Sequence, residues 1–301
     1  MLQSFLGNEA LKRDLQAALR AGRLSHSVLL CGQEGCGAGY AARCLAADYL
    51  YPQGGPQAQA VMESRAAECL EVRGEGASGE IKIDRIRQIR RQVFETALSA
   101  QGRVVILYGV QHLNQSSANA LLKVLEEPPQ GVLFVLTASS AAAVLPTIRS
   151  RCSQYTVAPV SPQQCSQWLA QHCPKAPQRE LLALVYDGCI GRAAHAAQDP
   201  AGQKNFQTAC TIAGQLAAGS RYQVLCSLAA YERDKPGAQQ LLSDLAALGS
   251  AALSHPGCCG LSPHQGAVVA AACGQAQEEM ARNVNLKLLL TNLAVRLTKQ
   301  G

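Results

Sequence analysis

Short apolar runs alternate with amphipathic stretches along the first half of the chain. The runs at 26–32, 102–110 and 131–139 are predominantly apolar, as expected of strands buried on both faces of a sheet. Stretches with helical spacing lie at 7–24 and 116–129, and the second ends in two prolines. Buried strands that alternate with helices are typical of parallel βαβ units, so the pattern predicts a doubly wound sheet.

The residues at the ends of these stretches predict helix boundaries. Asn8 is expected to cap the first helix, and Gly22 to end it. Another helix is predicted over 81–98, with Asp84 as its cap. Its apolar face consists of Ile86, Ile89, Val93 and Phe94.

The remaining sequence consists of a loose segment and a helical half. Residues 51–80 contain stretches rich in Pro, Gly and Gln, which indicate an insertion or an exposed connection. Strand patterns stop at about Val160, and Ser161 followed by Pro162 opens a series of amphipathic helices. The expected fold class is therefore α/β plus α, a parallel sheet domain followed by helical domains.

Composition narrows the class of protein. The 301 residues are 48% hydrophobic but only 4% aromatic, which favours a helix-rich protein over a β-sandwich. No segment has the pattern of a signal peptide or a membrane span, so we expect a cytoplasmic protein. The net charge of +6 is spread along the chain and permits, without requiring, contact with nucleic acid or an acidic partner.

The thirteen cysteines are scattered along the chain. Several lie in apolar helical patterns, where a free thiol behaves as a small apolar side chain. These are Cys44, Cys165, Cys210 and Cys226. We expect no disulfide framework.

A glycine-rich loop joins the first predicted strand to the next helix. A working P-loop reads G-x-x-x-x-G-K-[ST]: backbone amides hold phosphates, the lysine neutralises them and the hydroxyl binds Mg²⁺. Gly32 and Gly37 have the required separation, with Gly35 between them, but Ala38 and Gly39 replace the lysine and the hydroxyl. Because each lost charge-assisted hydrogen bond is worth about 1.5–3 kcal/mol, we expect no tightly bound ATP.

The second element of such a site is altered as well. A P-loop ATPase ends its next buried strand with Asp-Glu, which position Mg²⁺ and the attacking water. Here Tyr108 and Gly109 follow that strand. A glycine-rich turn after a strand also occurs without any nucleotide function, but two losses in the correct order favour a degenerate nucleotide-binding fold.

Longer motifs carry a specific resemblance. The stretches "NALLKVLEEPP" and "LPTIRSRC", at 119–129 and 145–152, resemble the clamp-loader AAA+ proteins of bacterial DNA replication. The likeness extends over 22–32, 81–90 and 283–293. Within that family the chain is similar to the delta prime class, whose P-loop is decayed, and such a subunit need not hydrolyse ATP.

The resemblance implies an architecture and a set of partners. It implies a degenerate AAA+ P-loop domain over 1–158, a three-helix lid over 159–201 and a C-terminal helical collar over 202–301, which joins the other collars in a ring of five subunits. The implied partners are the gamma or tau and delta subunits, the β sliding clamp, and primer-template DNA contacted through its backbone within the complex.

The resemblance also assigns a role to the interface motif Ser150, Arg151 and Cys152. In the family its arginine, here Arg151, acts as an arginine finger on the ATP bound by the neighbouring subunit. The alternative is that Arg151 forms a local salt bridge or caps a helix. Arg149 either shares that interface or faces solvent.

For three other polar residues, Glu126, Glu127 and Thr137, we expect structural or local roles rather than catalytic ones. Glu126 and Glu127 are paired carboxylates of the kind used in acid-base catalysis, but a structural or interface role at the helix end is the better interpretation. Thr137 falls where an active AAA+ protein senses the γ-phosphate, and we expect it to pack or hydrogen-bond locally.

Many members of the family that the chain resembles carry a zinc module of four cysteines. The corresponding segment 51–80 holds only Cys69, so we expect no zinc and no other metal there. The pairs Cys31 with Cys36 and Cys258 with Cys259 have no second pair at metal-binding spacing and are expected to be buried or loop thiols.

The sequence thus predicts a non-catalytic clamp-loader subunit that supports ATP-driven loading of the sliding clamp onto primed DNA. It would belong to the DNA polymerase III holoenzyme without ATPase activity of its own, and ATP would be bound by its neighbour. Two alternatives stay open: an active clamp-loader ATPase of the gamma or tau type, and a stand-alone DNA-binding protein.

Overall fold

A computed structural model describes residues 1–76, 79–94, 102–282 and 284–299. The chain forms two compact units, Met1–Val160 and Ser161–Gly301. Within the described residues, no helix combines the length and apolar character that crossing a membrane requires. The predicted division into three parts, with a separate lid, stays a prediction.

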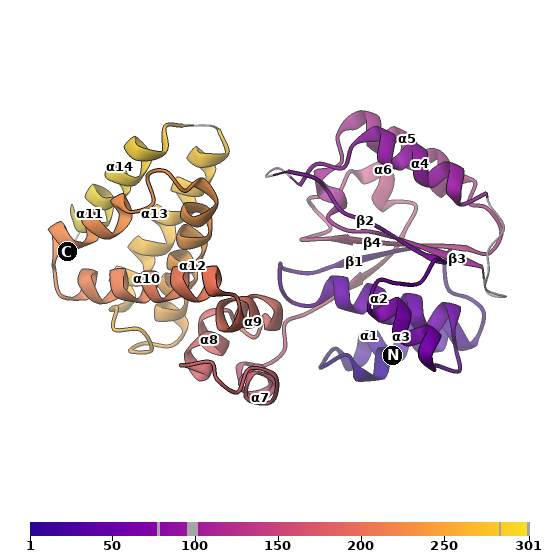
Figure 1. Ribbon diagram of the computed structural model, residues 1–301, viewed down its shortest axis with the longest axis horizontal. Helices are drawn as coiled ribbons and strands as arrows, with labels where there is room; N and C mark the ends of the chain where they lie inside the picture. Colours follow the sequence, from indigo (N-terminus) through magenta and orange to yellow (C-terminus); the bar gives the residue numbers. More distant parts are fainter. Residues whose placement is uncertain (77–78, 95–101, 283, 300–301) are drawn as a thin grey trace. The chain divides into compact units, whose positions relative to one another are not determined.

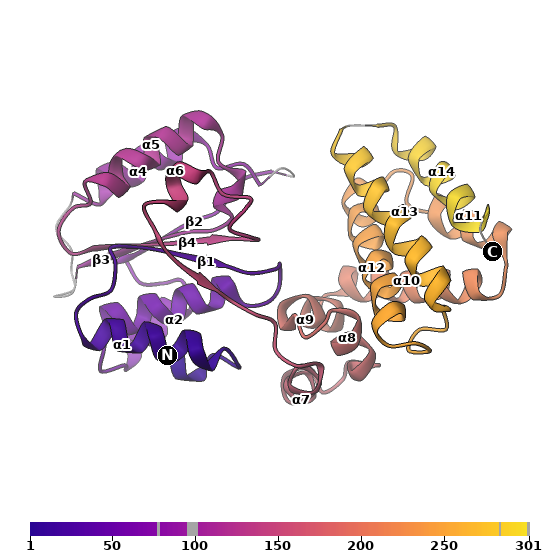
Figure 2. The ribbon, with the colours of Figure 1, turned by 180° about the vertical axis from the view of Figure 1, so that it is seen from behind.

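The first unit is a parallel five-stranded sheet with helices on both faces, as Figures 1 and 2 show. The strand order is β2-β3-β4-β1-β5, and every neighbouring pair is parallel. The strands are β1 (Ser27–Cys31), β2 (Cys69–Val72), β3 (Arg103–Leu107), β4 (Val132–Ala138) and β5 (Ser153–Thr156). The predicted α/β class is confirmed for this unit.

Helices α1 (Glu9–Arg20), α2 (Ala38–Leu50) and α3 (Pro56–Met62) cover one face of the sheet. Helices α4 (Ile83–Gln92), α5 (Gln115–Glu126) and α6 (Pro146–Arg149) cover the other. Two 3₁₀ turns, η1 (Leu2–Ser4) and η2 (Val110–His112), complete the unit. Every residue of β1, β3 and β4 is buried, as their continuous apolar runs predict.

The loose segment holds regular structure that the sequence did not predict. Residues 51–80, predicted as an insertion or an exposed connection, contain α3 and the edge strand β2, so the segment is more than a connection. The strand was missed because it has only four residues, and Glu71 interrupts its apolar pattern.

One predicted helix cap and one core position were also wrong. Asn8 takes the N-cap position of α1 as predicted, but its side chain does not bond the helix: its amide exchanges two hydrogen bonds, of 2.9 and 2.8 Å, with the backbone of Ala158. Asp84 lies inside the first turn of α4. Because α4 ends at Gln92, Phe94 leaves the apolar face and is 68% exposed. The part of this predicted helix beyond residue 94 lies outside the described residues.

The second unit is helical, which confirms the predicted change of class after Val160. Ser161 and Gln164 form a capping box at the start of its first helix, as the Ser-Pro pattern suggested. Its helices are α7 (Pro162–His172), α8 (Arg179–Val185), α9 (Ile190–Gln198), α10 (Pro200–Ala217), α11 (Arg221–Ala229), α12 (Lys235–Ser254), α13 (Pro263–Ala281) and α14 (Leu286–Lys299).

Helices α12 and α13 approach each other closely at two glycines. A Cβ atom on Gly266 would stand 2.7 Å from the carbonyl oxygen of Gly249 and 2.8 Å from the Cβ of Ala252. Only glycine leaves room for the two backbones at this crossing.

A buried carboxylate connects α12 to the preceding helices. Asp244 is fully buried and accepts hydrogen bonds of 2.8 Å from the Tyr186 hydroxyl and from Gln240 Nε2. Arg192 lies over the Tyr186 ring, 4.7 Å from its centroid. The network joins α12 to the segment between α8 and α9.

All thirteen cysteines are free thiols. Cys44 and Cys165 are buried, as expected for thiols in apolar helical patterns. Cys210 is half-buried, and Cys226 lies exposed on α11 despite its apolar sequence neighbours.

Candidate functional site

The glycine-rich loop between β1 and α2 contains two glycines in left-handed backbone conformations. Gly35 and Gly37 have positive φ angles of 82° and 100°, which glycine adopts without strain. Gly32 has no room for a side chain, because a Cβ atom would collide with the Val157 carbonyl oxygen and the Cys36 sulfur. The loop geometry therefore explains the glycines without any bound ligand.

Tyr108 packs against the first turn of α2. Its Cε1 would lie 3.0 Å from a Cβ atom placed on Gly39. Gly39 stands where a P-loop carries its Mg²⁺-binding hydroxyl, and Tyr108 stands where it carries a Mg²⁺-binding carboxylate. The Tyr108 ring thus occupies the space that a side chain at position 39 would need.

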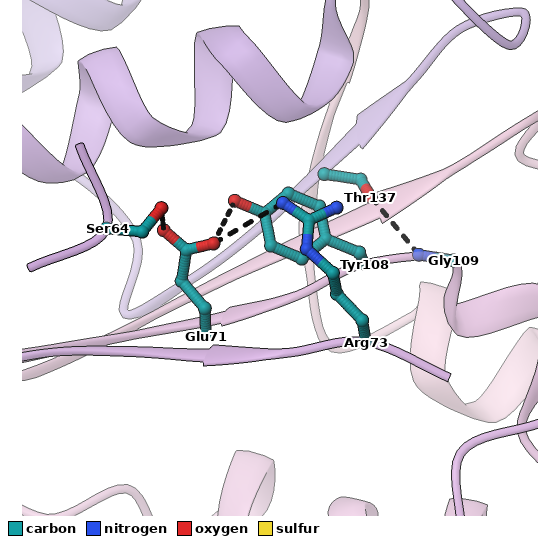
Figure 3. A network of polar contacts seen from close by, with 6 residues as sticks. All are labelled: Ser64, Glu71, Arg73, Tyr108, Gly109 and Thr137. Carbon is teal, nitrogen blue, oxygen red and sulfur yellow. Dashed lines mark hydrogen bonds and ion pairs between the residues drawn. The ribbon is translucent and has the colours of Figure 1, made fainter. Parts of the chain in front are cut away.

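A polar network fixes the Tyr108 ring (Figure 3). The Tyr108 hydroxyl donates a 3.0 Å hydrogen bond to Glu71 Oε2, and the Ser64 hydroxyl donates one of 2.7 Å to Glu71 Oε1. The Arg73 guanidinium lies over the ring, 3.7 Å from its centroid, and its Nη2 is 3.4 Å from Glu71 Oε2. Burial, followed by the Glu71 charge, raises the pKa of Tyr108, so its hydroxyl remains a donor.

Glu71 and Arg73 were not among the predicted site residues. Glu71 lies within β2 and Arg73 directly follows the strand, in the segment interpreted as an insertion or an exposed connection. The alternation in "CLEVR" is a weak signal for a strand that presents Glu71 and Arg73 on one face.

Gly109 and Thr137 form a second contact beside Tyr108. Gly109 has a positive φ of 70°, and its backbone N–H donates a 3.2 Å hydrogen bond to Thr137 Oγ1. Thr137 is 6% exposed near the end of β4. The expected local hydrogen bond of Thr137 is confirmed.

Arg151 lies directly after α6 and is held by two acceptors. Its Nη2 forms an ion pair of 2.6 Å with Glu126 Oε1, and its Nη1 donates a 2.9 Å hydrogen bond to the Thr147 carbonyl. The Arg151 side chain is 37% exposed and that of Glu126 is 47% exposed. The local salt bridge that the sequence left open therefore exists in the single chain, while a role in trans stays a prediction.

The residues around Arg151 differ in burial: Ser150 is exposed, Arg149 is half-buried and Cys152 is buried. Ser150 Oγ lies 3.4 Å from Arg151 Nη1, and Cys152 is buried, which raises the pKa of its thiol to about 12. Arg149 is half-buried and donates a 3.2 Å hydrogen bond to the Ala141 carbonyl. The alternative that Arg149 simply faces solvent was wrong.

The end of α5 is anchored to the sheet. His26, just before β1, has its Nε2 3.1 Å from the carbonyl oxygen of Leu125, in the last turn of the helix. Leu125 itself is buried. The structural role predicted for the helix end applies to Glu126 through its ion pair with Arg151, although Glu126 and Glu127 are both exposed.

The thiols do not gather into a metal centre in the part of the chain that is described. There, no three His, Cys, Asp or Glu side chains lie close enough together to hold a metal ion. Cys69 is buried in β2, and burial raises its pKa to about 12. Burial also raises the pKa of Cys31 and of Cys36. The absence of zinc stays a prediction.

Comparison with known families and proteins gives consistent matches. The family model described as DNA polymerase III, delta subunit, matches residues 7–161, just over half of the chain. A DNA polymerase III subunit gamma/tau of Mycobacterium tuberculosis is 33% identical over 176 residues, which cover 56% of this chain and 30% of that protein. A DNA polymerase III subunit delta' of Haemophilus influenzae is 35% identical over 113 residues, which cover 38% of this chain and 34% of that protein. The chain thus spans about a third of the length of these curated relatives.

Solved structures share the fold. A DNA polymerase III gamma subunit-related protein from Thermotoga maritima superimposes with a TM-score of 0.54 at 20% identity, covering 95% of this chain and 99% of that chain. A RuvB variant from Thermotoga maritima gives a TM-score of 0.51 at 16% identity, covering 99% and 86% of the two chains. These likenesses support the fold, a parallel sheet followed by helices.

Proposed function

Because this chain belongs to the clamp-loader AAA+ family of bacterial DNA polymerase III, we propose that it is a non-catalytic subunit of the delta prime type. In this role it supports ATP-driven loading of the sliding clamp onto primed DNA without hydrolysing ATP itself. The proposed partners are gamma or tau, delta and the β sliding clamp. Matches to subunits named gamma/tau and delta' support a place among such proteins.

The packing of Tyr108 on Gly39 carries this proposal. A nucleotide with Mg²⁺ needs a hydroxyl and a carboxylate at these positions, and the chain offers an aromatic ring against a glycine. The lysine is absent as well, since Ala38 follows Gly37. Binding Mg-ATP would require displacing the Tyr108 ring from its contacts with Glu71 and would recover none of the lost phosphate contacts.

The exposed Arg151 supports the second part of the proposal, an arginine finger. The guanidinium has five N–H donors in a fixed plane, and the contacts to Glu126 and Thr147 leave part of it exposed to solvent. Placed against a neighbouring nucleotide, it would stabilise negative charge on the transferring phosphoryl group.

The polar face of α4 supports contact with DNA inside the complex. The helix carries four exposed arginines: Arg85, Arg87, Arg90 and Arg91. Such side chains bind phosphates without reading sequence, so we propose contact with the primer-template backbone.

A nucleotide titration of the isolated chain tests the non-catalytic assignment. The purified protein is mixed with a fluorescent ATP analogue and Mg²⁺, and binding is followed by anisotropy. We expect no saturable binding up to millimolar nucleotide, whereas an active gamma- or tau-like ATPase saturates. Saturable Mg-dependent binding with hydrolysis would refute the assignment.

A second titration separates the remaining alternative. A stand-alone DNA-binding protein binds primed DNA by itself, with an affinity that falls steeply as salt rises. The proposed subunit binds weakly alone, and its contribution to binding becomes measurable only after the other loader subunits are added.

A further inference from the structure

The ion pair between Glu126 and Arg151 joins two separate elements of the first unit. Glu126 is the last residue of α5, and Arg151 follows α6. We propose that Glu126 is a positioning residue, which holds the Arg151 guanidinium ready to contact the nucleotide of a neighbouring subunit. This inference rests on the proposed function of Arg151 in trans.

The geometry fixes the guanidinium from two directions while leaving donors available. Glu126 Oε1 accepts from Nη2 at 2.6 Å, and the Thr147 carbonyl accepts from Nη1 at 2.9 Å. Nη1 also lies 3.4 Å from Ser150 Oγ, so the N–H groups left available are the second one on Nη2 and the one on Nε. The side chain is 37% exposed, and these N–H groups would contact the phosphate.

The end of α5 is a firm support for this contact. Its last turn is buried through Leu125, and His26 bonds the Leu125 carbonyl at 3.1 Å, which ties the helix end to the start of β1. The C-terminal end of a helix also carries partial negative charge, which favours a cation such as Arg151 nearby. Glu126 thus holds the guanidinium from an ordered element rather than from a loose loop.

Holding the side chain has a kinetic consequence. A free arginine samples many rotamers, and fixing it at the moment of docking costs conformational entropy. A guanidinium already oriented by Glu126 avoids much of that cost, and small misplacements of a catalytic group reduce turnover strongly. Glu126 should therefore affect kcat of the neighbouring ATPase more than its KM for ATP.

The test is ATP hydrolysis by a reconstituted loader with an active ATPase subunit, sliding clamp and primed DNA. Glu126→Ala removes both the charge and the hydrogen bond, whereas Glu126→Gln keeps an acceptor for Arg151. Glu127→Ala removes the adjacent exposed carboxylate and is the matched control. Assembly of each variant is checked by size-exclusion chromatography, and turnover is normalised to assembled complex.

We expect Glu126→Ala to lower kcat about tenfold with KM for ATP unchanged, the scale of a modest misplacement of a catalytic group. Glu126→Gln should retain turnover within about twofold of wild type, since the acceptor remains. Glu127→Ala should behave as wild type. Normal turnover of Glu126→Ala would overturn the inference, and so would faster turnover, which would mean that Glu126 restrains Arg151.

Arg151→Ala, measured in the same assay, distinguishes the role of Arg151 in trans from the positioning role of Glu126. If Arg151→Ala leaves turnover unchanged, the proposed function in trans fails and this inference fails with it. If Arg151→Ala lowers turnover while Glu126→Ala does not, only the positioning role of Glu126 is wrong.

Discussion

The buried carboxylate of Asp244 predicts how stability changes with pH. Burial raises the pKa of Asp244 from 3.8 to about 6, against the opposing effects of hydrogen bonds from Tyr186 and Gln240 and of the positive charge of Arg192. Its Oδ2 is buried without a hydrogen-bond partner among the described residues, which is consistent with a carboxyl group that favours its neutral form. Asp244→Asn removes this titration and keeps a similar shape.

The magnitude follows from the difference between the two pKa values. A shift of that size corresponds to about 3 kcal/mol, because each pKa unit equals about 1.4 kcal/mol. The folded protein binds the proton more tightly, so this stabilisation is complete below pH 3.8 and is lost as pH rises through about 6. Between pH 5 and pH 8, the lost part is roughly 1.4 kcal/mol.

Urea unfolding of the intact chain at pH 5, 6, 7 and 8 measures this loss. Relative to wild type, the Asn variant should gain roughly 1.4 kcal/mol in free energy of unfolding between pH 5 and pH 8. Asp234→Asn is the matched control, since Asp234 is exposed and caps the same helix α12 with a side-chain oxygen that Asn retains. Parallel curves for wild type and Asp244→Asn would refute the reasoning.

Three other outcomes are expected. Gly266→Ala should lower the free energy of unfolding by about 1–3 kcal/mol through overpacking against α12, while Gly274→Ala, in open space on the same helix, should be neutral or stabilising in the same denaturation assay. Tyr108→Phe, which removes the hydrogen bond to Glu71, should cost about 1 kcal/mol in thermal or chemical unfolding and should not create Mg-ATP binding. In the assembled loader, Arg90→Ala should weaken binding to primed DNA and reduce the slope of log affinity against log salt by about 1, without dependence on DNA sequence; an unchanged slope would contradict phosphate contact by α4.

The sheet was predictable where burial is complete on both faces. Strands β1, β3 and β4 are buried throughout and mostly apolar, with a single polar residue in each, so periodicity and length identify them without tertiary information. The edge strand β2 was not predictable in this way, because one of its central residues, Glu71, is polar and binds Tyr108. The prediction that Phe94 lies on the apolar face of α4 was wrong because its spacing fits the helix, but the helix ends two residues earlier.

The candidate site was predictable in its residue types and not in its contacts. The sequence shows that Ala38 and Gly39 replace the lysine and the hydroxyl. The contact of Tyr108 with Gly39 was not predictable, because it depends on how the end of β3 lies against the start of α2 in the fold. The ion pair of Arg151 with Glu126 joins residues far apart in the chain, and only the fold brings them together. Motifs therefore indicated which residues matter, and the structure supplied their partners.

The most direct test of the central claim is clamp- and DNA-stimulated ATP hydrolysis by a reconstituted loader with wild-type chain or Arg151→Ala, after equal assembly is shown. If Arg151 completes a neighbouring active site, turnover falls by an order of magnitude or more, since an arginine finger is worth about 10³ or more at a single site. Unchanged turnover would contradict catalysis in trans and would leave Arg151 with only the local salt bridge to Glu126.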